Sequence, residues 1–409
     1  MNAVADRGGA TTADGVVIRD GARTVVVAPP VPAPTFGQFS IAMLVTLARA
    51  RDAHAIAAFL PAASPWRPEW FQTVDGPAFE PLRGRLAAWG RVRWYLDRTS
   101  SRMTGTRRRA RLVWSREMHR ELRRQAGDER LPARSRMRFK EAARRALGWA
   151  PARGPQQAAF PRRLLRERIA VTLTNAARAE GDGLAGAAGV RAEAPIVAFE
   201  VPSRVEAAMP AIACLTGLGY VVVRVGSDSG GRLDMPGVID VASRGARPLL
   251  DVWLLLHARF LVCHSADWQQ AAYLTNTPTV RYDARDPFAA YPVRADGLLL
   301  LARAVDLESG RTLSLDERLG EDYFTQQRNI GHASCAADEL ADATREMHEQ
   351  LSAGAVDVDA AGQAAFRVHA TNAAMALAPE VAYVAEWGAD CGFLGDGRLA
   401  RVQARGAVT

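Results

Sequence analysis

Six residues that suit the binding of a phosphate-type anion follow stretches predicted to be β-strands. Hydroxyl groups, guanidinium groups and the amides at a helix N-terminus all donate hydrogen bonds to anions, and a glycine lets the backbone approach such a ligand closely. The candidates are Ser203, Arg204, Arg224, Gly226, His264 and Ser265. They lie in three separate parts of the sequence, so they form a site only if the fold brings these parts together.

Two of these candidates have an equally good structural interpretation. Arg224, at the end of a predicted strand, is suited to bind an anion, but also to form an ion pair with Asp240 or Asp228. Ser203 has the spacing of a helix capping box with Glu206, which would give it a purely local role. The sequence leaves both alternatives open.

The polar loop from His264 to Asp267 precedes a predicted helix. His264 and Ser265 therefore either cap this helix or contact a ligand. Asp251 lies inside another predicted helix, where we expect it to hold a neighbouring loop rather than to contact a substrate.

The stretch from Ala194 to Asp286 alternates short apolar runs with helical segments. Strands are predicted at 196–199, 220–225, 260–262 and 279–282, with a short apolar run at 238–239, and helices at 210–218, 248–257 and 268–274. This alternation predicts an α/β fold with a parallel sheet covered by helices on both faces. The carboxyl ends of parallel strands meet at one edge, so the loops at 202–204, 226–231 and 264–267 should lie near one another.

The N-terminal part of the chain predicts a second α/β unit. Residues 1–22 read as a disordered tail, 24–28 as a strand, and 55–60 as the next strand after a helix that begins near Phe39. Four prolines between 29 and 34 delay this helix, and the loop lacks the GxGxxG pattern of dinucleotide sites. Further along, 162–179 is predicted as one helix that the glycines between 181 and 189 would end.

Positive charge is concentrated in one segment. The 409 residues carry a net charge of +8, yet residues 101–150 alone hold 16 Lys and Arg against 5 Asp and Glu. This segment favours a solvated helix face, a surface for acidic lipid head groups or a polyanionic glycan, or nucleic acid, in that order. Nucleic acid comes last because aromatic interleaving and a known binding motif are both absent, so we do not expect it as a partner.

The remaining composition predicts a cytoplasmic protein. The start of the chain lacks the basic and apolar regions of a signal peptide, and no apolar run approaches the ~20 residues that span a bilayer. The four cysteines are scattered without metal-ligand spacing, so we expect no metal and reduced, structural thiols.

The motifs between Ala194 and Leu351 resemble those of bacterial surface-polysaccharide glycosyltransferases, and more distantly those of ADP-heptose transferases. The resemblance rests on segments that occur in the family's order: 210–212, 219–226, 237–240 with Asp251, and Asn276-Thr-Pro278 before the last strand. The closing Phe393-Leu-Gly-Asp-Gly extends it.

The resemblance implies a GT-B architecture of two Rossmann-like domains that needs no metal or other cofactor. The expected order is a tail at 1–22, an N-terminal domain at 23–160 with an Arg-rich helical insertion at about 100–150, a C-terminal domain at 161–351, and a helical extension at 352–409. The C-terminal domain would hold a nucleotide-sugar through the six candidates, and the N-terminal domain would face a glycan or lipid-linked acceptor. Contact with the inner membrane through the Arg-rich segment is one of the open interpretations.

Two departures from the family pattern bear on activity. The chain has Phe199-Glu-Val-Pro-Ser203 where relatives carry a charged motif, and Ser265-Ala-Asp267 where they favour Ser-Ser-Gly. An inward-facing Asp267 carboxylate would repel a diphosphate. The general base that an inverting enzyme needs has three candidates without geometry behind them: Asp52, Glu69 and Asp75.

Two other classes of protein remain as alternatives. A non-catalytic scaffold or glycan-binding protein of the same architecture would fit the departures from the family pattern. A nucleotide-dependent oxidoreductase would need the loop at 226–231 to open a helix, but 232–236 does not continue as one.

Overall fold

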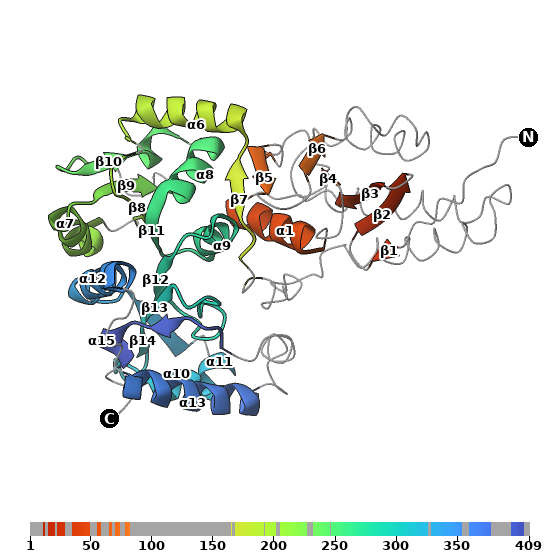
Figure 1. Ribbon diagram of the computed structural model, residues 1–409. Helices are drawn as coiled ribbons and strands as arrows, with labels where there is room; N and C mark the ends of the chain where they lie inside the picture. The colour runs from red at the N-terminus through yellow and green to blue at the C-terminus, as the bar shows by residue number, and fades with distance from the viewer. Residues whose placement is uncertain are drawn as a thin grey trace, which may run out of the picture. The chain divides into compact units, whose positions relative to one another are not determined.

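The computed structural model describes the main elements of the chain in two compact units (Figure 1). It describes residues 11–12, 15–20, 23–28, 35–49, 55–58, 65–67, 70–73, 78–81, 165, 168–191, 193–201, 205–226, 232–245, 247–325, 329–353, 360–377 and 394–404. The first unit is Met1–Ala158 with Ile169–Thr174, and the second is Ala159–Arg168 with Asn175–Thr409. The Arg-rich segment, the expected linker at 148–161 and the loop at 227–231 lie outside the described residues.

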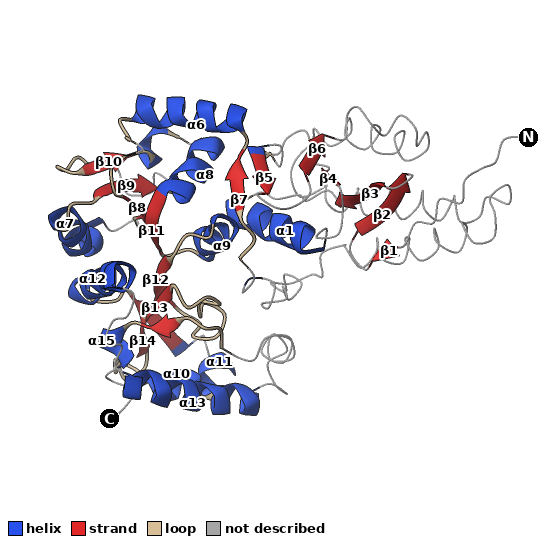
Figure 2. Cartoon of the chain, viewed as in Figure 1, coloured by secondary structure: helices blue, strands red, loops and turns tan. Residues whose placement is uncertain are grey.

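The second unit is an α/β domain built on one parallel sheet of seven strands, as the alternation of strands and helices predicts (Figure 2). Its strands lie in the order β10-β9-β8-β11-β12-β13-β16, and every neighbouring pair is parallel. The bounds are β8 (Ile196–Glu200), β9 (Val221–Val225), β10 (Val238–Asp240), β11 (Ala258–Cys263), β12 (Thr279–Ala284), β13 (Gly297–Leu301) and β16 (Arg398–Leu399).

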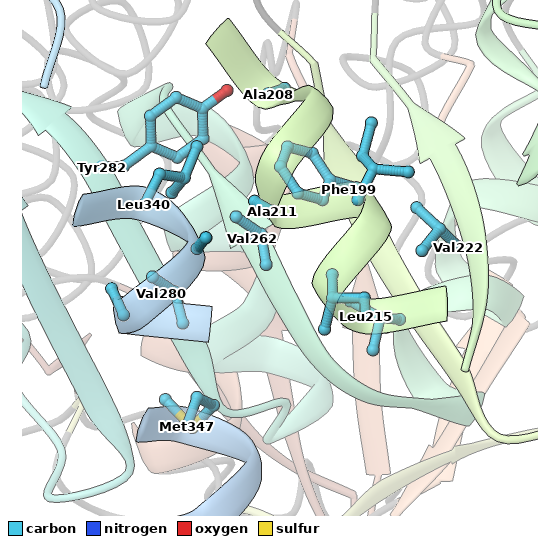
Figure 3. Close-up of a cluster of buried hydrophobic side chains, with 14 of the residues drawn as sticks. Phe199, Ala208, Ala211, Leu215, Val222, Val262, Val280, Tyr282, Leu340 and Met347 are labelled. Atoms are coloured by element: carbon cyan, nitrogen blue, oxygen red, sulfur yellow. The ribbon is translucent and has the colours of Figure 1, made fainter. Parts of the chain in front are cut away.

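Helices α7 (Met209–Gly217) and α12 (Ala337–Ala353) cover one face of this sheet. Their apolar residues form a core with alternate residues of the strands, including Phe199, Val262 and Tyr282 (Figure 3). The alternation follows from strand geometry, because successive side chains point to opposite faces. Helices α8 (Pro248–His257) and α9 (Ala266–Thr275) pack against the other face, with α6 (Asn175–Ala188) lying along α8.

The strand order creates a crevice at one place on the carboxyl edge. Numbered from β8, the first six strands lie in the order 3-2-1-4-5-6, so the chain direction reverses between β8 and β11. The connections after these two strands leave toward opposite sides, which opens a gap between the loops. Ligands of open α/β sheets bind at this switch point. It is therefore the first place to look for a site.

The prediction of one helix at 162–179, ended by glycines, is wrong. Residues 171–173 form strand β7, which pairs antiparallel with β5 (Phe71–Thr73) in the first unit. Helix α6 starts at Asn175 and continues through Gly181, Gly183 and Gly186. Gly181 is needed because α6 lies close to α8: a Cβ atom there would stand 2.6 Å from Cδ1 of the buried Trp253. Tertiary packing thus outweighs the low helix propensity of glycine.

Gly181→Ala should destabilise the protein, whereas Gly183→Ala should stabilise it. A Cβ at Gly183 meets no atom within 4 Å, so alanine there gains up to about 1 kcal/mol of helix propensity. At Gly181 the same methyl group must displace a buried indole, which costs about 1–3 kcal/mol. Urea denaturation of the two variants measures both values. Equal effects at the two glycines would contradict the close packing of α6 on α8.

The end of the chain belongs to the sheet and is not only a helical extension. After α13 (Ala360–Leu377), β16 adds the seventh strand and α15 (Arg401–Ala404) follows. A second core joins α13 to β12 and β13 around Phe366 and Tyr291. Between β13 and α12 lie β14 (Arg303–Asp306), α10 (Leu315–Leu319), α11 (Glu321–Thr325) and β15 (Ile330–Ala333).

The first unit has a five-stranded sheet in the order β1-β2-β3-β4-β6. The strands are β1 (Thr11–Thr12), β2 (Gly15–Asp20), β3 (Arg23–Ala28), β4 (Ala55–Ala58) and β6 (Ala78–Pro81), and helix α1 (Phe36–Arg49) joins β3 to β4. β3 and β4 are parallel, as the sequence predicts. The predicted disordered tail is wrong for 15–20: the β-branched run Val16-Val17-Ile18 pairs antiparallel with β3.

Candidate functional site

The carboxylate of Glu200 fills the switch point between β8 and β11. One oxygen, Oε2, accepts hydrogen bonds from the backbone amides of His264 at 3.0 Å and Ser265 at 2.9 Å. The residue is 7% exposed. Backbone amides in this position, where a helix begins after a strand, are those that hold anions in many α/β proteins. In this chain an internal carboxylate occupies them.

Three neighbours fix Glu200 in place. The Tyr282 hydroxyl, from β12, donates to the backbone carbonyl oxygen of Glu200 at 2.7 Å. Gly226, which follows β9, has φ of +98°, and a Cβ there would lie 3.2 Å from Cγ of Glu200 and 3.5 Å from Nε1 of Trp268. Gly226 therefore serves both a left-handed turn and a close approach to the carboxylate side chain.

Ser265 caps helix α9, which is one of its two predicted roles. Its Oγ accepts a hydrogen bond from the backbone amide of Trp268 at 3.2 Å. The His264 side chain is 39% exposed, and its Nδ1 lies 3.4 Å from Oε2 of Glu200. Asp267 stands in the first turn of α9, where the helix dipole favours a carboxylate. The predicted loop at 264–267 is thus only two residues long before the helix starts.

Arg224 has the structural role among its two predicted ones. It is fully buried, and its Nη1 donates to Oδ2 of Asp240 on the neighbouring strand at 2.9 Å. Asp240 also accepts from the amides of Leu233 at 2.7 Å and Ser243 at 3.0 Å. Burial acts to raise the pKa of Asp240, but these amides and Arg224 outweigh it and hold the pKa below its ordinary value. The pair ties β9 to β10 instead of facing a ligand.

Sequence reasoning missed Arg281 in β12. Only 8% of this residue is exposed, and its Nε and Nη1 have no hydrogen-bond partner in the part of the chain that the structure describes. The signal was present as a single arginine inside the apolar run predicted as the strand 279–282. A charged residue in a buried strand is rare unless it is paired or serves a function.

Asp251 does not hold a loop within the described residues, contrary to our expectation. No described group makes a hydrogen bond to its side chain, which lies in the first turn of α8. Although the residue keeps some exposed area, protein atoms surround its carboxyl group, and this burial raises the pKa to about 7.

The raised pKa of Asp251 predicts a specific pH dependence of stability. The unfolded chain releases the proton near the ordinary value of 3.8 and the folded chain near 7, so wild-type stability falls as pH rises between these values. Asp251→Asn should remove this loss and raise the free energy of unfolding by about 1–2 kcal/mol at pH 8, with little change at pH 4. Denaturation at both pH values, with the exposed Asp342→Asn as control, measures it. An equal effect at both pH values would contradict the assigned cause.

The other predicted site residues lie outside the described residues. These are Ser203, Arg204, the potential partner Asp228, and the candidate bases Asp52, Glu69 and Asp75. A hollow of about 570 Å³ lies elsewhere, beside the edge strand β10, and is lined by residues that include Arg232, Asp234, Ile239 and Arg244. It is not at the switch point.

Two searches of the described residues gave no candidates. No group of three or more His, Cys, Asp and Glu in the described ranges has the arrangement of a metal site. None of the described helices is long and apolar enough to cross a bilayer.

Comparisons with known proteins give two distant structural likenesses. One is a glycosyl transferase family 9 protein from Veillonella parvula, at 12% identity and a TM-score of 0.37, covering 68% of this chain and 85% of that chain. The other is the E. coli ADP-heptose LPS heptosyltransferase II, at 14% identity and a TM-score of 0.33, covering 68% and 89%. No family model and no curated protein sequence matches the chain. At these TM-scores the likenesses carry no conclusion about activity.

Proposed function

We propose that the protein is a GT-B-type glycosyltransferase, which moves a sugar from a nucleotide-sugar to a cell-surface glycan or a lipid-linked acceptor. The observation that carries this proposal is the switch point of the seven-stranded sheet, where the loops after β8, β9 and β11 converge around Glu200, Gly226 and His264. Sheets of this strand order bind nucleotides at that point. The family resemblance of residues 194–351 supplies the sugar and the transfer reaction.

The chemistry of transfer asks for stabilised negative charge at this point. When the sugar leaves, charge develops on the nucleoside diphosphate, and backbone amides, a helix N-terminus and basic side chains can stabilise it without a metal. The half-exposed His264 and the start of α9 are the described groups in position to do so. The amides of His264 and Ser265 become available to a phosphate only when the Glu200 carboxylate moves away.

The acceptor side of the proposal belongs to the first unit. A general base there, for which Asp52, Glu69 and Asp75 are the candidates, would take the proton of the attacking hydroxyl group. We propose a cytoplasmic enzyme of bacterial polysaccharide biosynthesis. Contact of the Arg-rich segment with anionic lipid would bring it to a lipid-linked acceptor.

A non-catalytic scaffold or glycan-binding protein is the second candidate function. Two observations favour it: Glu200 satisfies the amides that would hold a diphosphate, and Arg224 is buried in an ion pair. A chain that had lost donor binding would need such internal replacements for the missing anion.

Donor binding and hydrolysis by the full-length protein separate these candidates. The protein is mixed with UDP-, GDP-, ADP- and CMP-sugars, and the melting temperature and the release of the nucleotide product are measured. A transferase should be stabilised by one nucleotide class, by about 1.4 kcal/mol at tenfold excess over the dissociation constant, and should release that nucleotide slowly. Binding without any release under all conditions would favour the scaffold.

A matched pair of variants places the donor at the proposed site. His264→Gln should weaken donor binding by about tenfold, or ~1.4 kcal/mol. His369→Gln changes an exposed histidine on α13, and it should leave binding unchanged. If no nucleotide-sugar binds to wild type, or if both variants bind as wild type does, the proposed donor site is wrong.

A further inference from the structure

Arg281 is a buried cation without a counter-charge. Its Nε and Nη1 atoms are inaccessible to solvent and have no hydrogen-bond partner among the described residues. Other buried arginines of the same unit are better satisfied: all three guanidinium nitrogens of Arg294, for example, donate to described oxygen atoms. A guanidinium group without partners in a protein interior costs free energy, so its retention needs an explanation.

Arg281 and Glu200 stand on either side of Cys263 on the same face of the sheet. Cys263 pairs in register with Arg281 on β12, and the pairing of Val262 with Phe199 places Glu200 beside Cys263 on β8. In-register neighbours on parallel strands point to the same face. Burial raises the pKa of the Cys263 thiol, Arg281 opposes this rise and Glu200 adds to it, so both charges lie close to the thiol.

This row lies directly below the start of α9. Cys263 is followed by His264 and Ser265, whose amides Glu200 occupies, and α9 then runs for ten residues from Ala266. The carboxyl edge therefore presents two features that suit one anion: amides at a helix N-terminus and an arginine with unused donors. Glu200 takes only the first of these, since no ion pair joins it to Arg281 in the described structure.

We propose that a phosphate-type anion binds at the switch point between Arg281 and the first amides of α9, in competition with the Glu200 carboxylate. The anion accepts hydrogen bonds from Arg281 and from the amides of His264 and Ser265, while Glu200 turns away. Glu200 then acts as the resident anion of the empty site. This inference depends on the proposed function only for the identity of the natural ligand, which would be the diphosphate of the donor.

Binding of inorganic pyrophosphate to the full-length protein tests the proposal. Titration calorimetry at constant ionic strength compares wild type with Glu200→Gln, Arg281→Met, Arg281→Lys and the control Arg259→Gln. Glu200→Gln removes the competing charge, so pyrophosphate should bind at least about tenfold more tightly than to wild type. Arg281→Met should lose at least tenfold, Arg281→Lys should lose less, and Arg259→Gln, at the amino end of β11, should bind as wild type does.

Stability without ligand gives an independent measurement. A cation kept for a ligand is not needed by the fold, so Arg281→Met should melt at or above the wild-type temperature. Variants of Arg281 that fail to fold or melt well below wild type identify a structural arginine and overturn the proposal. The same holds if Arg281→Met binds pyrophosphate as wild type does, or if Glu200→Gln does not bind it more tightly.

The experiment also separates this inference from the proposed function. Pyrophosphate carries no sugar, so its binding through Arg281 in a protein that releases no nucleotide from any nucleotide-sugar supports the anion site and contradicts the transferase. Sugar transfer that is unchanged in Arg281→Met supports the transferase and contradicts the anion site.

Discussion

Asp240→Ala is expected to lower the free energy of unfolding by about 3–5 kcal/mol, because it leaves the guanidinium of Arg224 buried without its carboxylate. Arg224 has no exposed surface, and the pair spans two neighbouring strands at 2.9 Å. The same substitution removes the acceptor of the Leu233 and Ser243 amides, which adds to the loss.

Arg224→Met should cost less than Asp240→Ala. Asp240 keeps its two backbone donors when the arginine is removed, and it lies closer to solvent. Urea denaturation of both variants measures the difference, and Asp234→Ala, an exposed carboxylate near the same strand, is the control. If the two losses are equal, or if Arg224→Met costs more, the charge of Arg224 is not the main source of the effect.

The Asp240 contribution should also fade in acid. Its folded pKa is held below the ordinary value of 3.8, so the stabilisation is fully present above that value and is lost as pH falls through the folded pKa. The difference between wild type and Asp240→Ala should therefore shrink below about pH 4. A difference that persists unchanged would point to packing instead of charge.

Gly395→Ala is expected to destabilise the protein by about 3 kcal/mol, because a methyl group has no room there. A Cβ atom at Gly395 would lie 2.3 Å from the carbonyl oxygen of Pro292 and 2.4 Å from Cα of Val293. These are backbone atoms of a segment whose carbonyl groups accept hydrogen bonds from Asp396 and Gly397. The backbone must move to make space, and the attachment of β16 would weaken.

Thermal denaturation of Gly395→Ala, with Gly186→Ala as control, tests this close contact. A Cβ atom at Gly186 meets nothing within 4 Å, so that variant should be neutral or slightly stabilising. A melting temperature of Gly395→Ala at or above that of wild type would show that the segment before β16 does not pack against Pro292 and Val293. The result would also decide whether the Gly-Asp-Gly motif has a structural role.

The sequence predicted the site's framework well and its contents poorly. The loops after β8, β9 and β11 were expected to meet, and the switch point of the sheet brings the ends of these three strands together. Within it, the cap formed by Ser265 was one of two open alternatives, while the position of the Glu200 carboxylate was not foreseen. A strand-terminal Glu reads as an ordinary end of a strand, because its partners are amides that lie 64 and 65 residues away.

Local pattern determined which segments became strands and helices between 194 and 351, since continuous apolar runs and helical periodicity are properties of neighbouring residues. Tertiary structure decided what charge and glycine mean, because these depend on partners distant in sequence. Arg224 was equally suited to a ligand and to Asp240 until the sheet placed β9 beside β10. Gly181 suggested a break, but α6 continues because the glycine fits against Trp253. Arg281 was one basic residue among many, and only its burial without a partner distinguishes it.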